Sequence, residues 1–175
     1  MNHSILLEKL NEGIEGVSTG FGGMMYEALL VCLNSQNHIS GITLPITTNT
    51  EINTFTLNWS NQIDDNIIRS HKDKNRTTDY GAMGLSVLLA LKLTDYTGYT
   101  TSQKGDGVDF WLETEDEMFA ARLEISGIME ETKSNNVGKR LKIKLKQTNQ
   151  SDESFTPVFV SIIEFKKPMG VFWKK

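Results

Sequence analysis

Two alternating segments joined by an acidic turn constrain the fold of this chain most strongly. Residues 107–113, GVDFWLE, and residues 119–126, FAARLEIS, largely alternate in side-chain direction, which is the period of a β-strand. A turn centred near residues 116 and 117 pairs them as an antiparallel hairpin. In this register Asp109 lies opposite Glu124, with their Cβ atoms about 5 Å apart.

Two carboxylates in facing positions of a hairpin repel each other. Such a pair is tolerated beside a divalent cation, beside a basic side chain, or when one carboxyl is protonated. All three solutions are open at Asp109 and Glu124, and the sequence therefore predicts a functional site there. The structural alternative is that these carboxylates pair with Arg122 or Arg140.

Length and composition indicate one ordinary globular domain. The chain has 175 residues, of which 38% are hydrophobic, and this is enough for a sizeable core. A net charge of -4 argues against coating nucleic acid by bulk electrostatics, so only a local basic surface would bind a polyanion. Cys32 has no partner cysteine, and we see no membrane-spanning stretch or signal-like start. We therefore expect a cytoplasmic protein with no membrane association.

The N-terminal half, residues 1–76, is expected to contain helices and a β-hairpin. Its cluster of glycines over 13–23 lacks the Gly-Lys-Ser/Thr of a phosphate-binding loop and is interpreted as a turn. The expected elements are a short helix over 4–11 capped by Ser4, a helix or buried segment over 24–36, strands over 38–46 and 52–59, and a surface connection over 60–76 with room for a short helix near 65–69.

The second half, residues 77–175, has the pattern helix, strand, strand, helix, strand. Residues 79–93 are apolar on nearly every side, which predicts a central helix packed on a sheet. Its start is marked by Thr77, Thr78 and Asp79. After the hairpin come a basic amphipathic helix over 135–148 and a buried strand over 157–167. We expect a single α/β domain with a mixed central sheet flanked by helices.

The basic helix has three distinct faces on a helical wheel. Arg140, Lys144 and Gln147 border its apolar stripe, and a long side chain there can reach carboxylates on the sheet. The opposite face is interpreted as solvated charge. The apolar stripe consists of Val137, Leu141, Leu145 and Thr148, and the solvated face carries Lys139, Lys142 and Lys146.

The segments GDGVDFWL and ARLEISGI, with the helix before them, resemble the PD-(D/E)xK nuclease superfamily. The restriction-endonuclease-like core of that superfamily presents an acidic residue from a helix, an Asp on one strand and Glu-x-Lys on the next. The resemblance covers residues 79–165. It implies Asp79 as the helix acid, Asp109 as the strand acid and Glu124 as the glutamate, together holding Mg²⁺ or Mn²⁺. The alternative for Asp79 is a helix N-cap.

Ser126 departs from this pattern, because it stands where the superfamily has lysine. That lysine orients or activates the attacking water and stabilises developing charge, which a hydroxyl group cannot do electrostatically. Some members supply the cation from a neighbouring helix. Lys144, with Arg140 and Gln147 one turn to either side, is the candidate here, and Lys104 is a weaker substitute.

The resemblance implies metal-dependent hydrolysis of phosphodiesters in DNA or RNA. In that hypothesis Asp109, Glu124, Ser126 and Lys144 belong to the catalytic centre. The substrate-binding residues are expected to be Arg140, Gln147 and Lys104.

Two alternative hypotheses give the same residues a role without catalysis. The first is a non-catalytic protein of the same fold that binds a partner protein, as an immunity or defence accessory factor. Ser126 and the acidic overall charge favour it. The second is a structural subunit whose carboxylates satisfy buried arginines.

Overall fold

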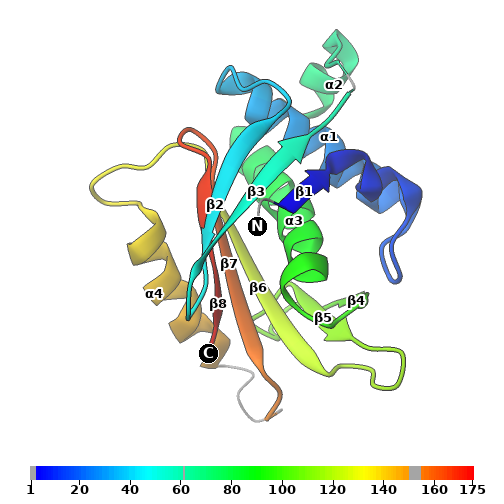
Figure 1. Ribbon diagram of the computed structural model, residues 1–175, viewed down its shortest axis with the longest axis vertical. Coiled ribbons are helices and arrows are strands. Elements are labelled where there is room, and N and C mark those ends of the chain that lie inside the picture. The colour runs from blue at the N-terminus through cyan, green and yellow to red at the C-terminus, as the bar shows by residue number, and fades with distance from the viewer. Residues whose placement is uncertain (1–2, 61, 150–154) are drawn as a thin grey trace.

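A mixed β-sheet runs through the whole structure and carries helices on both faces (Figure 1). The computed structural model describes residues 3–60, 62–149 and 155–175. These residues form a single α/β domain around an eight-stranded sheet with the order β1-β3-β2-β8-β7-β6-β5-β4. The elements are β1 (His3–Leu6), the 3-10 helix η1 (Leu7–Glu12), α1 (Thr19–Ser35), β2 (Ile42–Thr47), β3 (Ile52–Asn58), α2 (Asp65–Ser70), α3 (Lys74–Leu93), β4 (Gly98–Thr101), β5 (Phe110–Glu113), β6 (Ala121–Ile128), α4 (Val137–Gln147), β7 (Val158–Glu164) and β8 (Met169–Lys174).

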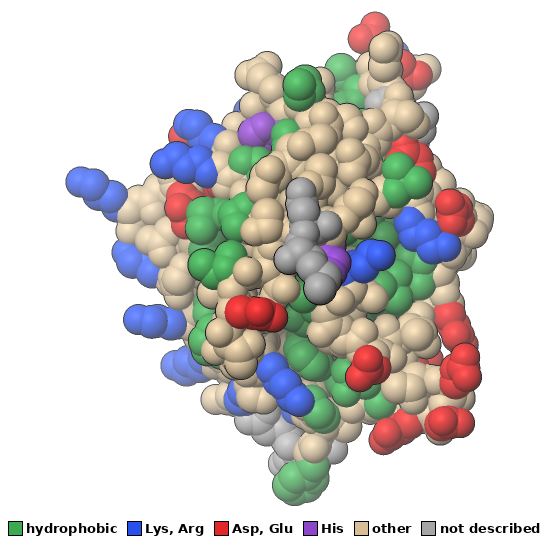
Figure 2. Space-filling model, in the orientation of Figure 1, with side chains coloured by type: hydrophobic (Ala, Val, Ile, Leu, Met, Phe, Trp, Pro, Cys, Tyr) green, Lys and Arg blue, Asp and Glu red, His purple; other side chains and the backbone are tan. Residues whose placement is uncertain are grey.

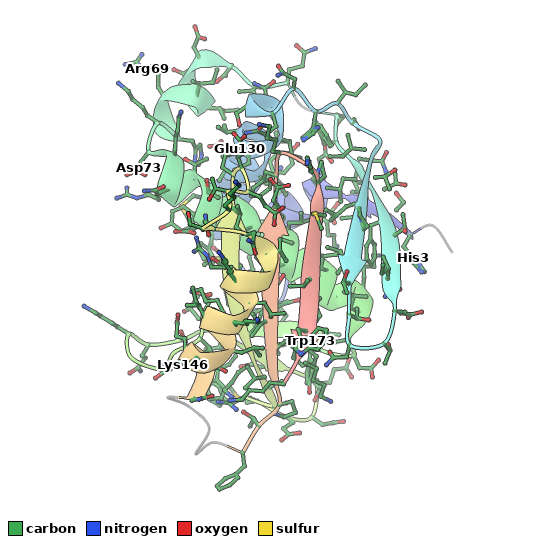
Figure 3. All side chains as sticks on the ribbon, turned by 90° about the vertical axis from the view of Figure 1, so that its left-hand side faces the viewer. His3, Arg69, Asp73, Glu130, Lys146 and Trp173 are labelled. Atoms are coloured by element: carbon green, nitrogen blue, oxygen red, sulfur yellow. The ribbon has the colours of Figure 1, made fainter. Side chains whose placement is uncertain are left out.

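The two faces of the sheet are covered unequally. The helices α1 and α3 pack on one face over the larger core, while α4 alone covers the other (Figures 1 and 3). Strand β7 is buried along its whole length because it lies between these layers. Its Phe159 and Ile163 join the larger core, and its Val160 and Ile162 join the smaller core under α4.

The start of the chain differs from the predicted helix over 4–11. Residues His3–Leu6 form β1, which pairs in parallel with β3, and only Leu7–Glu12 is helical. Ser4 is not a cap, because its Oγ accepts a hydrogen bond from Asn58 Nδ2 at 2.9 Å. Burial of Ile5 between two exposed neighbours gives this segment a strand pattern.

The rest of the N-terminal half follows the prediction more closely. Strands β2 and β3 form the expected antiparallel hairpin, and α2 lies in the connection where a short helix was expected. Helix α1 begins earlier than predicted, at Thr19, with Ser18 Oγ accepting from Phe21 N at 3.2 Å. Three glycines assigned to a turn, Gly20, Gly22 and Gly23, are therefore helical. Cys32 is buried within the larger core.

Helix α3 begins five residues before the predicted start at Asp79. Its N-cap is Asp73, whose carboxylate accepts from Arg76 N at 3.1 Å, so the N-cap interpretation of Asp79 is wrong. The predicted order of the second half also lacked β4, a four-residue edge strand paired with β5, and β8, which pairs with β7. Helix α4 and strand β7 lie where they were expected.

Candidate functional site

The hairpin of β5 and β6 has the predicted register. Phe110 pairs with Leu123 and Trp111 with Arg122, as predicted, and the pairing ends at Phe110, one residue short of Asp109. Asp109 lies just before β5, and its backbone N–H donates to the carbonyl of Leu123 at 2.9 Å. The charge of Lys144 on α4 acts on both acids, so their side chains lie together on the α4 side of this strand end.

The carboxyl groups of Asp109 and Glu124 lie close enough to influence each other's pKa. Burial raises the pKa of Glu124 to about 7, and the negative charge of Asp109 adds to the rise while Lys144 opposes it. Burial also raises the pKa of Asp109, although Asp109 Oδ2 accepts a hydrogen bond from Ile125 N at 2.7 Å. Near pH 7 Glu124 is therefore about half protonated, whereas an exposed glutamate would be ionised.

Lys144 and Gln147 reach Glu124 from α4, as their position beside the apolar stripe predicted. Lys144 Nζ lies 2.5 Å from Glu124 Oε1, and Gln147 Nε2 donates to the same oxygen at 3.0 Å. Gln147 Oε1 accepts from Lys144 Nζ at 3.2 Å, which holds the two α4 side chains together. The basic partner of Glu124 is therefore Lys144.

Arg140 is directed to Ser126, one step further along β6. Its Nη1 donates to Ser126 Oγ at 3.1 Å, and its Nη2 donates to Asn135 Oδ1 at 2.7 Å. Arg122 lies buried on the same face of β6 and donates from Nη2 to the carbonyl of Thr156 at 2.6 Å. The side chain of Ser126 thus helps to hold the guanidinium group of Arg140 two residues along β6 from Glu124.

A close approach of α3 to β6 positions Asp79. A Cβ atom on Gly127 would lie 2.4 Å from the carbonyl oxygen of Thr78, so only glycine permits this packing. Asp79 and Arg140 both line a cleft of about 550 Å³. Partial burial raises the pKa of Asp79, although its side chain keeps solvent access. The positive charges of Lys144 and Arg140 oppose this rise in pKa.

The carboxyl pair opens into a second, polar cleft of about 680 Å³. Its walls come from α3, from the loop between β4 and β5, and from α4. This cleft unites five predicted site residues and adds Met83 and Gln103, which the sequence had not indicated. The spacing of Met83 four residues after Asp79 on α3 was the available signal for it. The predicted residues in the cleft are Lys104, Asp109, Glu124, Lys144 and Gln147.

Asp109 and Glu124 have the chemistry of a Mg²⁺ or Mn²⁺ site. These ions bind through one or two carboxylates and keep several waters, and the cleft leaves room for such waters. Loss of the Glu124 proton leaves two adjacent carboxylates that a cation would stabilise. Among the described residues no three His, Cys, Asp or Glu side chains form a group that could hold a metal ion. Asp79 is therefore not grouped with Asp109 and Glu124 as a third metal ligand.

Comparisons with protein-family models, curated proteins and solved structures found no match. Over the part of the chain that the structure describes, no helix has the length and apolar character needed to cross a membrane.

Proposed function

We propose that this protein is a metal-dependent nuclease that hydrolyses phosphodiesters in DNA or RNA, with a restriction-endonuclease-like core in residues 77–175. The observation that carries this proposal is the buried pair of Asp109 and Glu124, whose pKa values are both raised and which lies beside Lys144 in an open cleft. Two acids with raised pKa values and a specific cationic partner in a cleft are typical of functional sites.

In this proposal Asp109 and Glu124 hold the cation through their oxygens. A bound Mg²⁺ or Mn²⁺ supplies polarisation of a phosphoryl oxygen and a water of lowered pKa. Lys144 offsets negative charge developing beside Glu124, in place of the lysine absent at Ser126. Gln147 fixes the direction of the Lys144 ammonium group.

Two further cations are placed to bind substrate phosphates. Lys104 lines the carboxylate cleft, and Arg140 lines the adjoining cleft with Asp79. Ser126 supports this role by accepting a hydrogen bond from Arg140. A guanidinium group so fixed retains further N–H donors for phosphate oxygens.

The distribution of surface charge supports a polyanionic substrate. Lysine and arginine side chains gather on the α4 side of the molecule, and acidic side chains gather on the opposite side in the same view (Figure 2). Lys139, Lys142 and Lys146 are exposed on α4, with Lys146 near its C-terminal end (Figure 3). A net charge of -4 thus conceals a local basic face next to the cleft.

Cleavage assays with isosteric variants test the proposal. We expect wild-type protein to cut supercoiled plasmid or single-stranded RNA in Mn²⁺, and Asp109→Asn or Glu124→Gln to lose at least about 100-fold in rate. Asp116→Asn, in the turn of the same hairpin, is the matched control and should keep full activity. Absence of cleavage by the wild type, or cleavage by both variants at the wild-type rate, refutes the proposal.

A non-catalytic role in binding a partner protein, as an immunity or defence accessory factor, is the second candidate. It is favoured by the hydrogen bonds from Lys144 and Gln147, which satisfy one oxygen of Glu124 within the protein itself. In that case Mn²⁺ should leave the melting temperature of the protein unchanged, because only a ligand bound by the folded state stabilises it.

A further inference from the structure

A third cleft, of about 540 Å³, adjoins the carboxylate cleft and differs from it in character. Both clefts are lined by Thr101 and Gln103, so they are neighbours on the surface. The walls of the third cleft are mainly apolar and include the rings of Trp111 and Phe119. Its volume is in the range of small-ligand sites.

The two aromatic rings are held in a fixed arrangement at the surface. The ring centroids of Trp111 and Phe119 lie 5.6 Å apart with an interplanar angle of 84°. Phe119 has a φ of 55°, a left-handed conformation that is costly for a bulky residue, and its surface is 45% exposed. The left-handed backbone places the Phe119 ring against Trp111 at the surface, where a ligand can reach the aromatic pair.

The distance from the rings to the carboxyl pair suits a single nucleotide. Trp111 and Asp109 are two residues apart and face the same side of the sheet, which separates them by about 7 Å along the chain. The amide of Gln103 and the hydroxyl of Thr101 lie between the clefts and offer hydrogen bonds to a base edge. A phosphate at Asp109 would therefore leave the attached base beside Trp111.

We infer that the cleft at Trp111 and Phe119 binds an unpaired nucleobase, which makes single-stranded nucleic acid the substrate class. The placement of the phosphate rests on the nuclease proposal, but the stacking site does not require catalysis. Stacking on an aromatic side chain accepts any base and needs a strand whose bases are free of pairing.

Binding of a fluorescent oligothymidine of about ten nucleotides, followed by anisotropy without divalent metal, tests the inference. Asp109→Asn serves as the parent protein, so that no strand is cut. We expect Trp111→Ala to weaken binding roughly 10- to 100-fold and Trp111→Phe to keep most of it. An abasic strand of equal length should bind weakly and equally to the parent and to Trp111→Ala.

Phe119→Ala removes the exposed ring and provides a second test, while Trp173→Phe on β8 is the control and should bind as the parent does. Equal binding of the thymidine and abasic strands, failure to bind either strand, or indifference to Trp111→Ala overturns the inference. Base-dependent binding by a wild-type protein that cuts no substrate supports the stacking site and refutes the nuclease proposal. Cleavage that does not depend on Trp111 supports the nuclease proposal and refutes the stacking site.

Discussion

The ammonium nitrogen of Lys144 lies 2.5 Å from Oε1 of Glu124, a residue with only 1% of its surface exposed. Asp109, the residue before β5, approaches the same carboxyl group, so Glu124 interacts with both a cation and a second acid. Lys144 and Gln147 both donate to Oε1 of Glu124, while the negative charge of Asp109 raises the pKa of this carboxyl group. The charge of this group of three therefore depends on one proton, and removing that proton favours a metal cation.

Replacing Lys144 by methionine should destabilise the protein in a pH-dependent manner. Lys144→Met keeps the apolar stem but leaves an ionised Glu124 buried without its cation. We expect the free energy of unfolding to fall by roughly 3 kcal/mol near pH 8 and by less near pH 6, where Glu124 holds a proton. Urea unfolding measures both values. Lys142→Met on the exposed face of α4 is the control, and equal losses at both pH values contradict the interpretation.

Titration of Glu124 should make the wild type less stable as the pH rises. Its pKa is about 7 in the folded protein against an ordinary value of 4.5, so the folded state binds more protons between these values. The contribution of Glu124 protonation to the free energy of unfolding is fully present below about pH 4.5. It amounts to roughly 3 kcal/mol and is lost as the pH rises through about 7. Glu124→Gln removes the titrating group and should flatten this part of the stability curve. Parallel curves for the two proteins would show that Glu124 titrates normally.

The carboxyl pair could be predicted from the sequence because its geometry is local. Asp109 and Glu124 belong to one hairpin, and the position of its turn alone determines which residues face each other. The reach of Lys144 and Gln147 also followed from helical periodicity, since α4 packs on the strand beside the pair.

The position of Asp79 within α3 depends on contacts between distant segments, and the sequence did not indicate where this helix begins. Asp73, Thr77, Thr78 and Asp79 are all acceptable N-caps, so side-chain type did not identify the first residue of α3. Strand β1 was mistaken for a helix for a similar reason. Residues His3–Leu6 are extended because they pair with β3, about fifty residues away, and such pairing overrides local propensity.

Binding of Mn²⁺ should stabilise the protein at alkaline pH and little at acidic pH, because the cation must displace the proton that Glu124 holds below about pH 7. At about a hundredfold excess over Kd we expect the melting temperature to rise by about 5–10 °C near pH 8. Differential scanning fluorimetry gives the shift. It should vanish in Asp109→Asn, and a shift of equal size near pH 5.5 would place the ion elsewhere.

Adding one methyl group at Gly127 should separate α3 from β6. The new Cβ of Gly127→Ala would meet the carbonyl oxygen of Thr78 at 2.4 Å, and such overpacking costs about 1–3 kcal/mol. The displaced helix carries Asp79, so Mn²⁺-dependent cleavage should also decrease. Gly20→Ala is the matched control, since a Cβ there meets nothing within 4 Å, and it should be neutral or stabilising by up to about 1 kcal/mol. Equal stabilities of the two variants in urea would contradict the close contact.

Moving the cation from α4 back to β6 tests whether Lys144 replaces the absent lysine. In Ser126→Lys/Lys144→Met the new ammonium group starts two residues from Glu124 on the same face of β6 and is long enough to reach its carboxylate. We expect Lys144→Met alone to lose about 100-fold or more in Mn²⁺-dependent cleavage and the double variant to recover about a tenth of wild-type activity. Ser126→Met/Lys144→Met has a side chain of similar bulk without charge and should stay inactive. If both double variants cleave equally slowly while remaining folded, the cation at Lys144 does not perform the role of the absent lysine.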